Sequence, residues 1–253
     1  MAGRDQIVQF CDELLDSASF SDYGPNGLQV PGAPEVTSVA TAVSAHLESI
    51  EAAVEADAQM LLTHHGLFWD FHDRALSEPM AARLRAAFEG GLSVAGYHLP
   101  LDAHAEIGNN VLLCRELGFE PEAGAIGVVK GRGIGAVGRR TEPISASGLF
   151  AAVESGLGRA PLVFAEGPEE IRSIGVISGS ASSEIHTAVA MGLDAFLTGE
   201  PSEHVMADAR EGKINFIAAG HYATEVCGIR ELGEAVARRF DIDHTFINIP
   251  NPI

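Results

Sequence analysis

The 253-residue sequence has too few cysteines, three in all, for a disulfide framework. Cys11, Cys114 and Cys227 lie far apart and form no CxxC pair, which also argues against a zinc site built from thiolates. We expect three reduced, buried thiols. Runs of about eighteen apolar residues are also missing, and the charged amino terminus has no long apolar core. We therefore expect neither export nor a membrane span, and a cytoplasmic location.

Basic residues are scarce as well. Only 16 lysines and arginines stand against 35 aspartates and glutamates, which gives a formal net charge of -19. Such a field repels phosphate backbones, so nucleic-acid binding is not expected. What the sequence does contain is typical of a folded globular protein, because 46% of its residues are hydrophobic.

Apolar strand-like runs alternate with amphipathic helical patterns along the chain. In the first half this predicts strands over 38–45, 59–64 and 92–98 and helices over 47–56, 77–90 and 107–118. A glycine-rich segment, 124–158, begins like a strand pair and turns helical. The second half predicts strands over 173–180, 194–199, 214–221 and 244–249 and helices over 182–192, 202–211 and 223–240. Strands joined by crossover helices predict an α/β fold with mixed or mainly parallel sheets.

The two halves align without gaps at a spacing of 135 residues, from Ser38 to Thr63 of the first half. The apolar pattern is shared along this stretch. Six positions are identical: Ser38/Ser173, Ile50/Ile185, Ala53/Ala188, Val54/Val189, Leu62/Leu197 and Thr63/Thr198. We therefore expect two intergrown, pseudo-duplicated lobes, residues 1–125 and 126–253.

Polar side chains gather where the predicted strands of both halves end. The motif LLTHHG matches FLTGEP, and YHLPLDAH resembles GHYATE one unit later. Ligands of open α/β sheets collect outside the carboxyl ends of strands. The candidate residues at these ends are His64, His65, His98, Asp102, His104, Glu200, His221 and Glu225.

Imidazoles mixed with carboxylates suit zinc, manganese or ferrous iron better than magnesium or calcium. Adjacent histidines diverge, so the His64–His65 doublet suits two metal ions, or one ion and a supporting role. Three imidazoles and two carboxylates are about the right number for two ions that share a carboxylate. The remaining histidines, His46, His72, His186 and His244, are expected to be ordinary surface or core residues.

Taken together, these motifs resemble one known family. The segments YGPNGLQV, LLTHHGLFW, YHLPLDAHAEIGNN, LTGE and GHYATEVCGIREL are similar, in order and from about residue 5 to 253, to the Nif-three-like dinuclear metal proteins, often labelled GTP cyclohydrolase type 2 homologues. The resemblance implies a toroidal homohexamer with two divalent ions per subunit. It also implies the ligands, with Glu225 as the bridge: His64, His65, Asp102, His221 and Glu225.

The family label implies a hydrolase in which metal-activated water attacks a guanine nucleotide or a similar cyclic amidine. His98 and Glu200 are candidates for proton transfer, and His104 and His204 for supporting or capping roles. Two alternatives stay open: a metal-dependent phosphoesterase or nuclease, which the charge of -19 disfavours, and a non-enzymatic metal-binding regulatory or interaction protein.

The sequence allows two interpretations for each of two further segments. Four basic residues fall within the glycine-rich stretch 130–140, which could approach an anion or form a solvated hairpin: Lys130, Arg132, Arg139 and Arg140. In YGPNGLQV, residues Pro25, Asn26 and Gly27 predict a tight turn, and whether that turn lines the site is not decided by the sequence.

Overall fold

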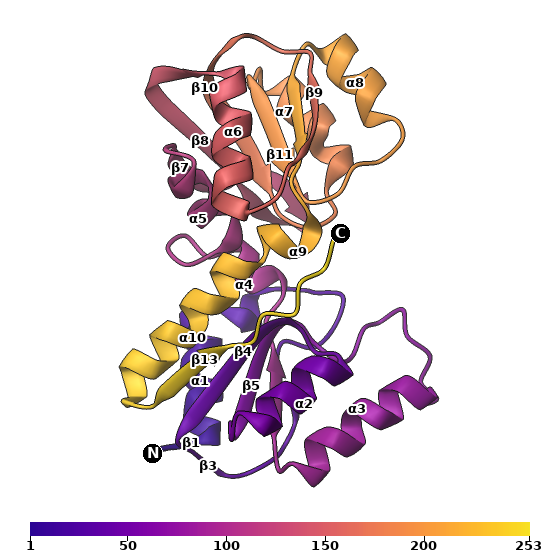
Figure 1. Ribbon diagram of the computed structural model, residues 1–253, viewed down its shortest axis with the longest axis vertical. Helices are drawn as coiled ribbons and strands as arrows, with labels where there is room; N and C mark the ends of the chain where they lie inside the picture. Colours follow the sequence, from indigo (N-terminus) through magenta and orange to yellow (C-terminus); the bar gives the residue numbers. More distant parts are fainter. The chain divides into compact units, whose positions relative to one another are not determined.

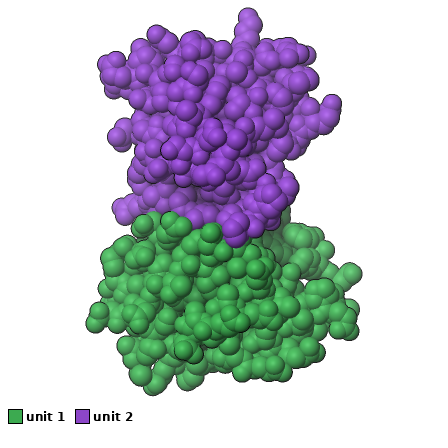
Figure 2. All heavy atoms as spheres, viewed as in Figure 1, with its two compact units in different colours: residues 1–101, 228–249 green, residues 102–227, 250–253 purple.

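The computed structural model describes all 253 residues, which divide into two compact units. The first unit comprises residues 1–101 and 228–249, and the second comprises 102–227 and 250–253 (Figure 2). These limits differ from the lobes predicted at 1–125 and 126–253. The last strand, β13 (Asp243–Phe246), pairs with β4 (Ser38–Ser44) in the sheet of the first unit, whereas β7 (Glu120–Val129) pairs with β8 (Arg132–Ser145) in the second unit.

The first unit contains a five-stranded mixed sheet in the order β13-β4-β5-β6-β2. Strands β13, β4, β5 (Met60–His65) and β6 (Ser93–Gly96) are parallel, and β2 (Gly27–Val30) joins the edge antiparallel. The short strands β1 (Ala2–Gly3) and β3 (Glu35–Val36) form a separate antiparallel pair. The central strands β4 and β5 are buried along almost their whole length, as expected for strands covered on both faces.

Helices cover both faces of this sheet (Figure 1). On one face, α2 (Leu47–Glu55) and α3 (Glu78–Glu89) bury Ile50 and Ala87 against sheet residues such as Leu61. On the other face lie α1 (Arg4–Leu14) and α10 (Val226–Phe240), whose Phe10 and Phe240 rings meet edge to face at 5.6 Å. Ser77 caps α3 by accepting a hydrogen bond from the backbone N–H of Met80, as the sequence predicts for a helix beginning there.

The second unit contains a six-stranded mixed sheet in the order β7-β8-β10-β11-β12-β9. Its parallel centre is β10 (Glu170–Ile177), β11 (Ala195–Thr198) and β12 (Asn215–Ala218). Antiparallel strands flank the centre on both sides: β7 (Glu120–Val129) and β8 (Arg132–Ser145) on one, β9 (Leu162–Ala165) on the other. Strand β9 was not predicted, because its four residues carry no clear alternation.

Helices α5 (Asn109–Glu116) and α6 (Ala146–Leu157) pack on one face of this sheet, where Leu113 and Leu149 join a buried cluster with Ile174. Helices α7 (Ile185–Ala190) and α8 (Val205–Gly212) contact each other and contribute the buried residues Ile185 and Val205. The shorter helical segments are η1 (Ser17–Ser19), α4 (Leu99–Ala103), η2 (Ser182–Glu184) and α9 (His221–Thr224). Together the two sheets confirm the α/β class with mixed sheets.

The predicted duplication extends to the pairing register. Val39 of β4 faces Met60 of β5, and the residues 135 positions later, Ile174 and Ala195, face each other in the second unit. Corresponding side chains of the two units also hydrogen-bond to β4 and β10 at equivalent positions. The Gln59 side-chain oxygen accepts the Ser38 N–H at 3.1 Å, and in the second unit a carboxylate oxygen of Asp194 accepts the Ser173 N–H at 2.9 Å. Residues 59 and 194 are again 135 apart.

The basic segment 130–140 includes the turn of the β7–β8 hairpin. Val129 pairs with Arg132, so Lys130 and Gly131 alone make the turn, and both have positive φ, 47° and 88°. That geometry is typical of a two-residue hairpin turn. Arg140 is held within its own hairpin, since its Nε donates to the Glu142 carbonyl oxygen at 2.6 Å.

The cysteines agree with the sequence expectation in two cases of three. None is in a disulfide, and Cys11 and Cys114 are buried, whereas Cys227 is half-buried. Burial raises the pKa of the Cys114 thiol to about 12, so this thiol is unreactive near neutrality. No helix of the chain combines the length and apolar character needed to cross a membrane.

Candidate metal-binding site

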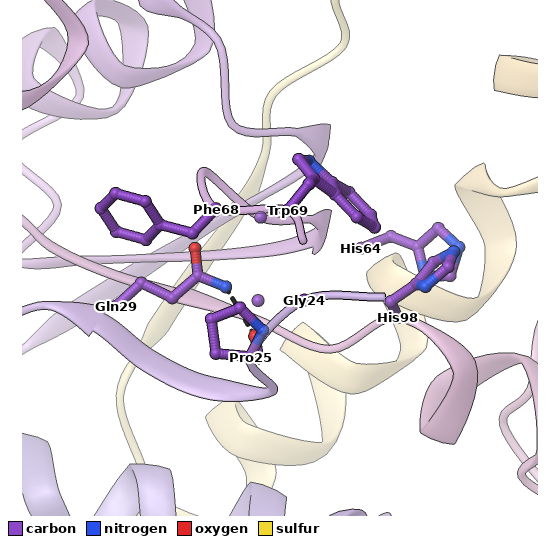
Figure 3. Close-up of a pocket in the computed structure, with 9 residues that line it drawn as sticks. Gly24, Pro25, Gln29, His64, Phe68, Trp69 and His98 are labelled. Atoms are coloured by element: carbon purple, nitrogen blue, oxygen red, sulfur yellow. Dashed lines mark hydrogen bonds between the residues drawn. The ribbon is translucent and has the colours of Figure 1, made fainter. Parts of the chain in front are cut away.

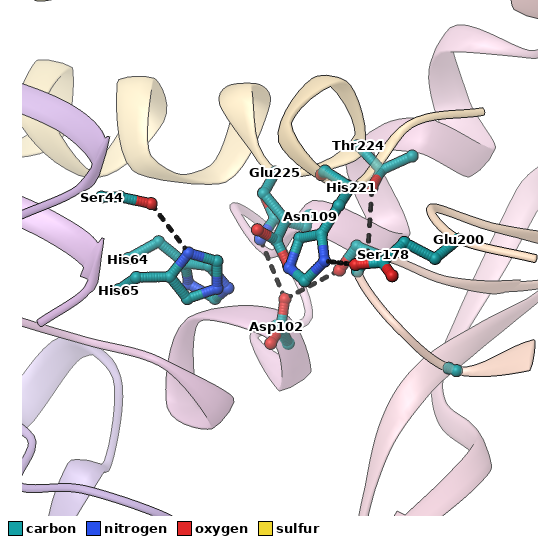
Figure 4. Close-up of polar contacts among 12 residues, drawn as sticks. Ser44, His64, His65, Asp102, Asn109, Ser178, Glu200, His221, Thr224 and Glu225 are labelled. Atoms are coloured by element: carbon teal, nitrogen blue, oxygen red, sulfur yellow. Dashed lines mark hydrogen bonds and ion pairs between the residues drawn. The ribbon is translucent and has the colours of Figure 1, made fainter. Parts of the chain in front are cut away.

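The histidine doublet ends β5, in the middle of the first sheet. His64 is fully buried, and its Nδ1–H donates to the Tyr97 carbonyl oxygen at 3.1 Å, which leaves the lone pair on Nε2. His65 is half-buried, and its Nδ1 is 3.0 Å from the Ser44 hydroxyl oxygen on β4 (Figure 4). The two ring centroids are 4.8 Å apart, and the rings are tilted by 46° to each other.

His98, which follows β6, joins the doublet. Its ring centroid is 5.1 Å from that of His64, and the ring nitrogens of His64, His65 and His98 form a group in which all ligand atoms lie within 4.8 Å. Its Nδ1 is 2.8 Å from a carboxylate oxygen of Asp22, and its backbone N–H donates to the Asn26 side-chain oxygen at 2.9 Å. The position of His98 is therefore set by the segment that begins at Asp22.

Asp22 is almost completely buried, with 2% of its side chain exposed. Burial alone would raise the pKa of this carboxyl group, but the hydrogen bond and charge of His98, with the donors of Asn26 and Tyr23, lower it to about 2. Asp22 is thus a fixed anion next to the His98 ring at neutral pH.

The YGPNGLQV segment does line the histidine cluster. Gly24, Pro25 and Gln29 border a small cavity together with His64 and His98 (Figure 3). Phe68 and Trp69 complete its wall, and the Trp69 ring meets His98 edge to face at 5.1 Å. The cavity is about 10 Å³ in volume, which corresponds to one water molecule and excludes an organic substrate.

In the second unit, His221 lies between two carboxylates at the end of β12 (Figure 4). Its Nδ1 makes a short contact with Glu200, and its Nε2 is 3.2 Å from an oxygen of Glu225. Burial would lower the pKa of His221, but the hydrogen bonds and charges of Glu225 and Glu200 raise it to about 9. Without a metal, this arrangement therefore holds a proton between two acids.

Glycines allow this close approach. Gly179, after β10, has a φ of 66°, and a Cβ there would lie 2.6 Å from Glu225 Oε1. Gly199, after β11, approaches the backbone of His221, whose Cα would lie 2.6 Å from an added Cβ. Gly220 has a φ of 99° and turns the chain into α9, so His221 opens that short helix. Glu225 falls between α9 and α10, whereas the sequence predicts one continuous helix over 223–240.

Asp102 is 5% exposed and lies on α4. Its Oδ1 accepts hydrogen bonds from the Asn109 amide at 2.9 Å and the Ser178 hydroxyl at 3.0 Å (Figure 4). Ser178 directly precedes Gly179, so the same strand end that admits Glu225 also orients Asp102. Both side chains are nearly buried carboxylates, which are rare unless they are paired or bind a cation.

The other histidines divide as follows. His46 caps α2, His104 Nδ1 accepts backbone N–H groups from Glu106 and Ile107, and His244 bonds the Thr41 hydroxyl at 2.8 Å. These are structural roles, and His72 is exposed. His204 is the N-cap residue of α8 and groups with His186 and Asp208. It does not group with the candidate metal ligands, so its position does not fit a role in supporting them.

Several residues of the site were not identified from the sequence. Asp22, Ser44 and Gln29 hold or border the first group, and Asn109 and Ser178 hold Asp102. Their only signal was position, because Asp22 precedes the predicted turn at 25–27 and Ser178 lies near the end of the strand predicted over 173–180. Nothing in the sequence alone distinguishes such residues from other loop and strand-end polar residues.

The donor set fits divalent metal ions. Each ligand candidate among the histidines has its Nδ1 engaged, by a carbonyl, a hydroxyl or a carboxylate, so Nε2 is the nitrogen oriented for a ligand. Metal-binding histidines are typically held in this way by a second hydrogen bond. Imidazole and carboxylate groups are ligand types that transition-metal ions such as zinc accept.

Comparison with known proteins agrees with this fold. The chain is 44% identical over 246 residues to a GTP cyclohydrolase 1 type 2 homolog of Pseudomonas aeruginosa, covering 97% of both chains. It is 39% identical to the Escherichia coli K12 homolog of the same name, covering 98% of both chains. Among solved structures, protein ybgI, described as of unknown function, superposes with a TM-score of 0.91 at 38% identity over the full length of both chains.

A protein of Thermus thermophilus also superposes, with a TM-score of 0.86 at 32% identity and complete coverage of both chains. Residues 2–252 match the family model described as Duf34/NIF3 (NGG1p interacting factor 3). Because both the family model and the relatives extend over nearly the whole chain, this protein belongs to the Duf34/NIF3 family.

Proposed function

We propose that the protein is a dinuclear metal-dependent hydrolase with the ligands His64, His65, Asp102, His221 and Glu225. The observation that carries the proposal is the shared arrangement of the ligand histidines, each of which has its Nδ1 held by a neighbouring group. Buried carboxylates at Asp102 and Glu225 supply the negative charge that two cations require.

Two divalent ions, when bound, would lower the pKa of water and stabilise the negative charge that develops on an attacked substrate. The protein's own residues would prepare that chemistry. Tyr97, Ser44 and Glu200 orient the ligand histidines, and Asn109 and Ser178 fix one oxygen of Asp102. These hydrogen bonds reduce the reorganisation that metal binding and catalysis require.

His98 is the residue best placed to move a proton. Its Nδ1 is held by the Asp22 carboxylate, and its ring lies within 5.1 Å of the His64 ring, measured between centroids. A carboxylate that orients a histidine and stabilises its protonated form is a recurrent device in acid–base catalysis. We therefore assign proton transfer to His98 Nε2. Glu200 is instead a positioning residue, because it contacts His221.

The relatives' name supports a cyclic amidine, such as a guanine nucleotide, as the substrate class. Hydrolysis at C8 of guanine opens the imidazole ring and releases formate, which gives the reaction a distinct product. The resemblance to this family also supports a homohexamer as the working assembly, and light scattering after size-exclusion chromatography measures its mass directly.

The test compares metal content and formate release in four proteins: the wild type, His65→Ala, His98→Ala and the control His72→Ala, which changes an exposed histidine. After loading with zinc, manganese or ferrous iron, we expect formate from GTP with the wild type and with His72→Ala. His65→Ala should lose metal and formate release together. His98→Ala should keep its metal and lose formate release.

Other results would reject this function. Release of phosphate or nucleotide without formate would indicate a phosphoesterase. Tight metal retention with no product from GTP, a generic phosphodiester or single-stranded DNA would indicate a metal-binding protein without this activity. If purified protein neither retains nor binds metal on titration, the dinuclear site itself is wrong.

A further inference from the structure

A second group of metal-binding side chains lies on the helices of the second unit. His186 is on α7, His204 begins α8, and Asp208 lies one turn further along α8. Their ligand atoms all lie within 4.8 Å of one another. His204 Nδ1 is 2.6 Å from Asp208 Oδ2, and His186 Nε2 is 3.5 Å from the same oxygen. The sequence alone suggested an ordinary surface role for His186.

The Asp208 carboxylate is paired with these two histidines. Its side chain is 21% exposed, and its ion pairs are with His186 and His204. The basic residue nearest in sequence, Arg210, points elsewhere and binds Glu166 through Nε and one terminal nitrogen, at 3.1 and 2.9 Å. No arginine or lysine therefore neutralises Asp208, and the two imidazoles converge on a half-buried anion.

The distances are close to those of a tetrahedral site. Zinc–nitrogen and zinc–oxygen bonds of about 2.05 Å place neighbouring ligands about 3.3 Å apart. The 3.5 Å separation of His186 Nε2 and Asp208 Oδ2 is already near that value. The 2.6 Å hydrogen bond between His204 and Asp208 must open by about 0.7 Å, which a side-chain rotation supplies.

The spacing along the chain favours chelation as well. His204 and Asp208 are four residues apart, so both side chains leave the same face of α8, as the two histidines of helical zinc motifs do. His186 adds the third ligand from α7, and its ring is nearly parallel to that of His204, with centroids 6.2 Å apart and an interplanar angle of 11°. Both histidines are exposed at the surface, where an ion can enter.

We propose that His186, His204 and Asp208 bind one divalent transition-metal ion, with water at the remaining positions. Two imidazoles and one carboxylate select borderline ions such as zinc, nickel or copper, and do not suit calcium or magnesium. The net charge of -19 favours cations at the surface in general. The ion ties α7 to α8 and is independent of the proposed hydrolytic centre, with which it shares no residue.

The experiment titrates zinc into protein whose tightly retained metal has been left in place, and follows the histidine ring resonances by NMR together with bound zinc at equilibrium. The proteins are the wild type, His186→Ala, His204→Ala, Asp208→Asn and the control His72→Ala. We expect one additional zinc per chain in the wild type and the control. Each of the three site variants should bind this zinc at least tenfold more weakly.

The wild-type spectra test the site without any substitution, since the ring signals of His186 and His204 should shift together and saturate at one zinc. An additional zinc that binds equally well to all three site variants would overturn the proposal, and so would shifts confined to one of the two histidines. Failure of the hydrolytic proposal has a different signature. His65→Ala should lose the retained metal and leave this additional zinc unchanged.

Discussion

The two units hold their candidate ligand histidines by different chemistry. In the first unit, neutral groups orient them, a backbone carbonyl for His64 and a hydroxyl for His65. In the second unit, carboxylates flank His221 on both ring nitrogens. A duplicated fold has thus kept its strand register and changed the charge at its strand ends. The difference teaches that the candidate donors of the first unit are neutral nitrogens, whereas the candidate donors of the second unit include carboxylates.

The largest effect should follow from removing one histidine in each unit. We expect His64→Ala and His221→Ala each to lower metal affinity by more than about a hundredfold, because a direct ligand is lost. Metal content after dialysis against a mild chelator measures this. The His72→Ala control should keep wild-type metal. If either variant retained both ions, the assignment of ligands to both units would fail.

The units should also respond to opposite ends of the pH scale once metal is removed. In the first unit the pKa of Asp22 is lowered to about 2, so its stabilisation is present above the ordinary value of 3.8 and is lost as pH falls through 2. In the second unit the pKa of His221 is raised to about 9, so its stabilisation is complete below 6.5 and is lost as pH rises through 9.

These shifts correspond to about 3 kcal/mol for His221 and about 2 kcal/mol for Asp22. Urea unfolding of the metal-free protein across the pH range measures both. Asp22→Asn should flatten the acid side alone, and Glu225→Gln should reduce the alkaline dependence alone, since Glu200 still raises the pKa of His221. A single variant that flattened both sides would mean that the two groups do not titrate independently.

A third comparison isolates the close approach at the end of β10. Gly179 and Gly192 have almost the same φ, 66° and 67°, but an added Cβ meets Glu225 Oε1 at 2.6 Å only at Gly179 and has open space at Gly192. Alanine at either position should cost about 1 kcal/mol of backbone strain. Gly179→Ala should cost about 1 kcal/mol more and should also weaken metal binding.

Urea unfolding and a zinc competition assay measure the two effects. Equal loss of stability in both variants, with metal affinity unchanged, would show that Gly179 serves the backbone alone and is not needed to admit Glu225.

Much of this arrangement was accessible from the sequence because it depends on local periodicity. The sequence predicts the alternation of strands and helices, the 135-residue repeat and the polar residues at strand ends. The strands that precede these polar residues are all present in the structure. Long-range contacts were not. Asp22 reaches His98 across 76 residues, and β13 joins β4 across almost the whole chain, so neither leaves a pattern within a sequence window.

The dependence on long-range contacts also explains why the sequence does not predict the group of His186, His204 and Asp208. His186 and His204 are 18 residues apart on different helices, and only the packing of α7 against α8 brings them together. A histidine on an exposed helical face has no sequence signal that separates a solvated residue from a ligand. A ligand set that is assembled from different helices therefore cannot be identified from the sequence alone. A histidine doublet at the end of one strand can be.

The smallest effect should come from the groups that orient the ligands, and it tests most directly the difference between neutral and charged partners of the ligand histidines. Glu200→Gln keeps a hydrogen-bonding group beside His221 Nδ1 but removes its charge, whereas Ser44→Ala removes a neutral hydroxyl beside His65 Nδ1. Carboxylate partners strengthen a ligand imidazole more than neutral ones do, since they stabilise the positive charge that the ring shares with the metal.

We therefore expect metal affinity to fall about tenfold in Glu200→Gln and by only a few-fold in Ser44→Ala. In the metal-free protein, the pKa of His221 should move down from about 9 in Glu200→Gln and should not change in Ser44→Ala, as NMR titration of the ring can establish. If Ser44→Ala weakened metal binding as much as Glu200→Gln does, orientation alone would account for both contacts. The charge at the second unit's strand ends would then serve the ions only through Asp102 and Glu225.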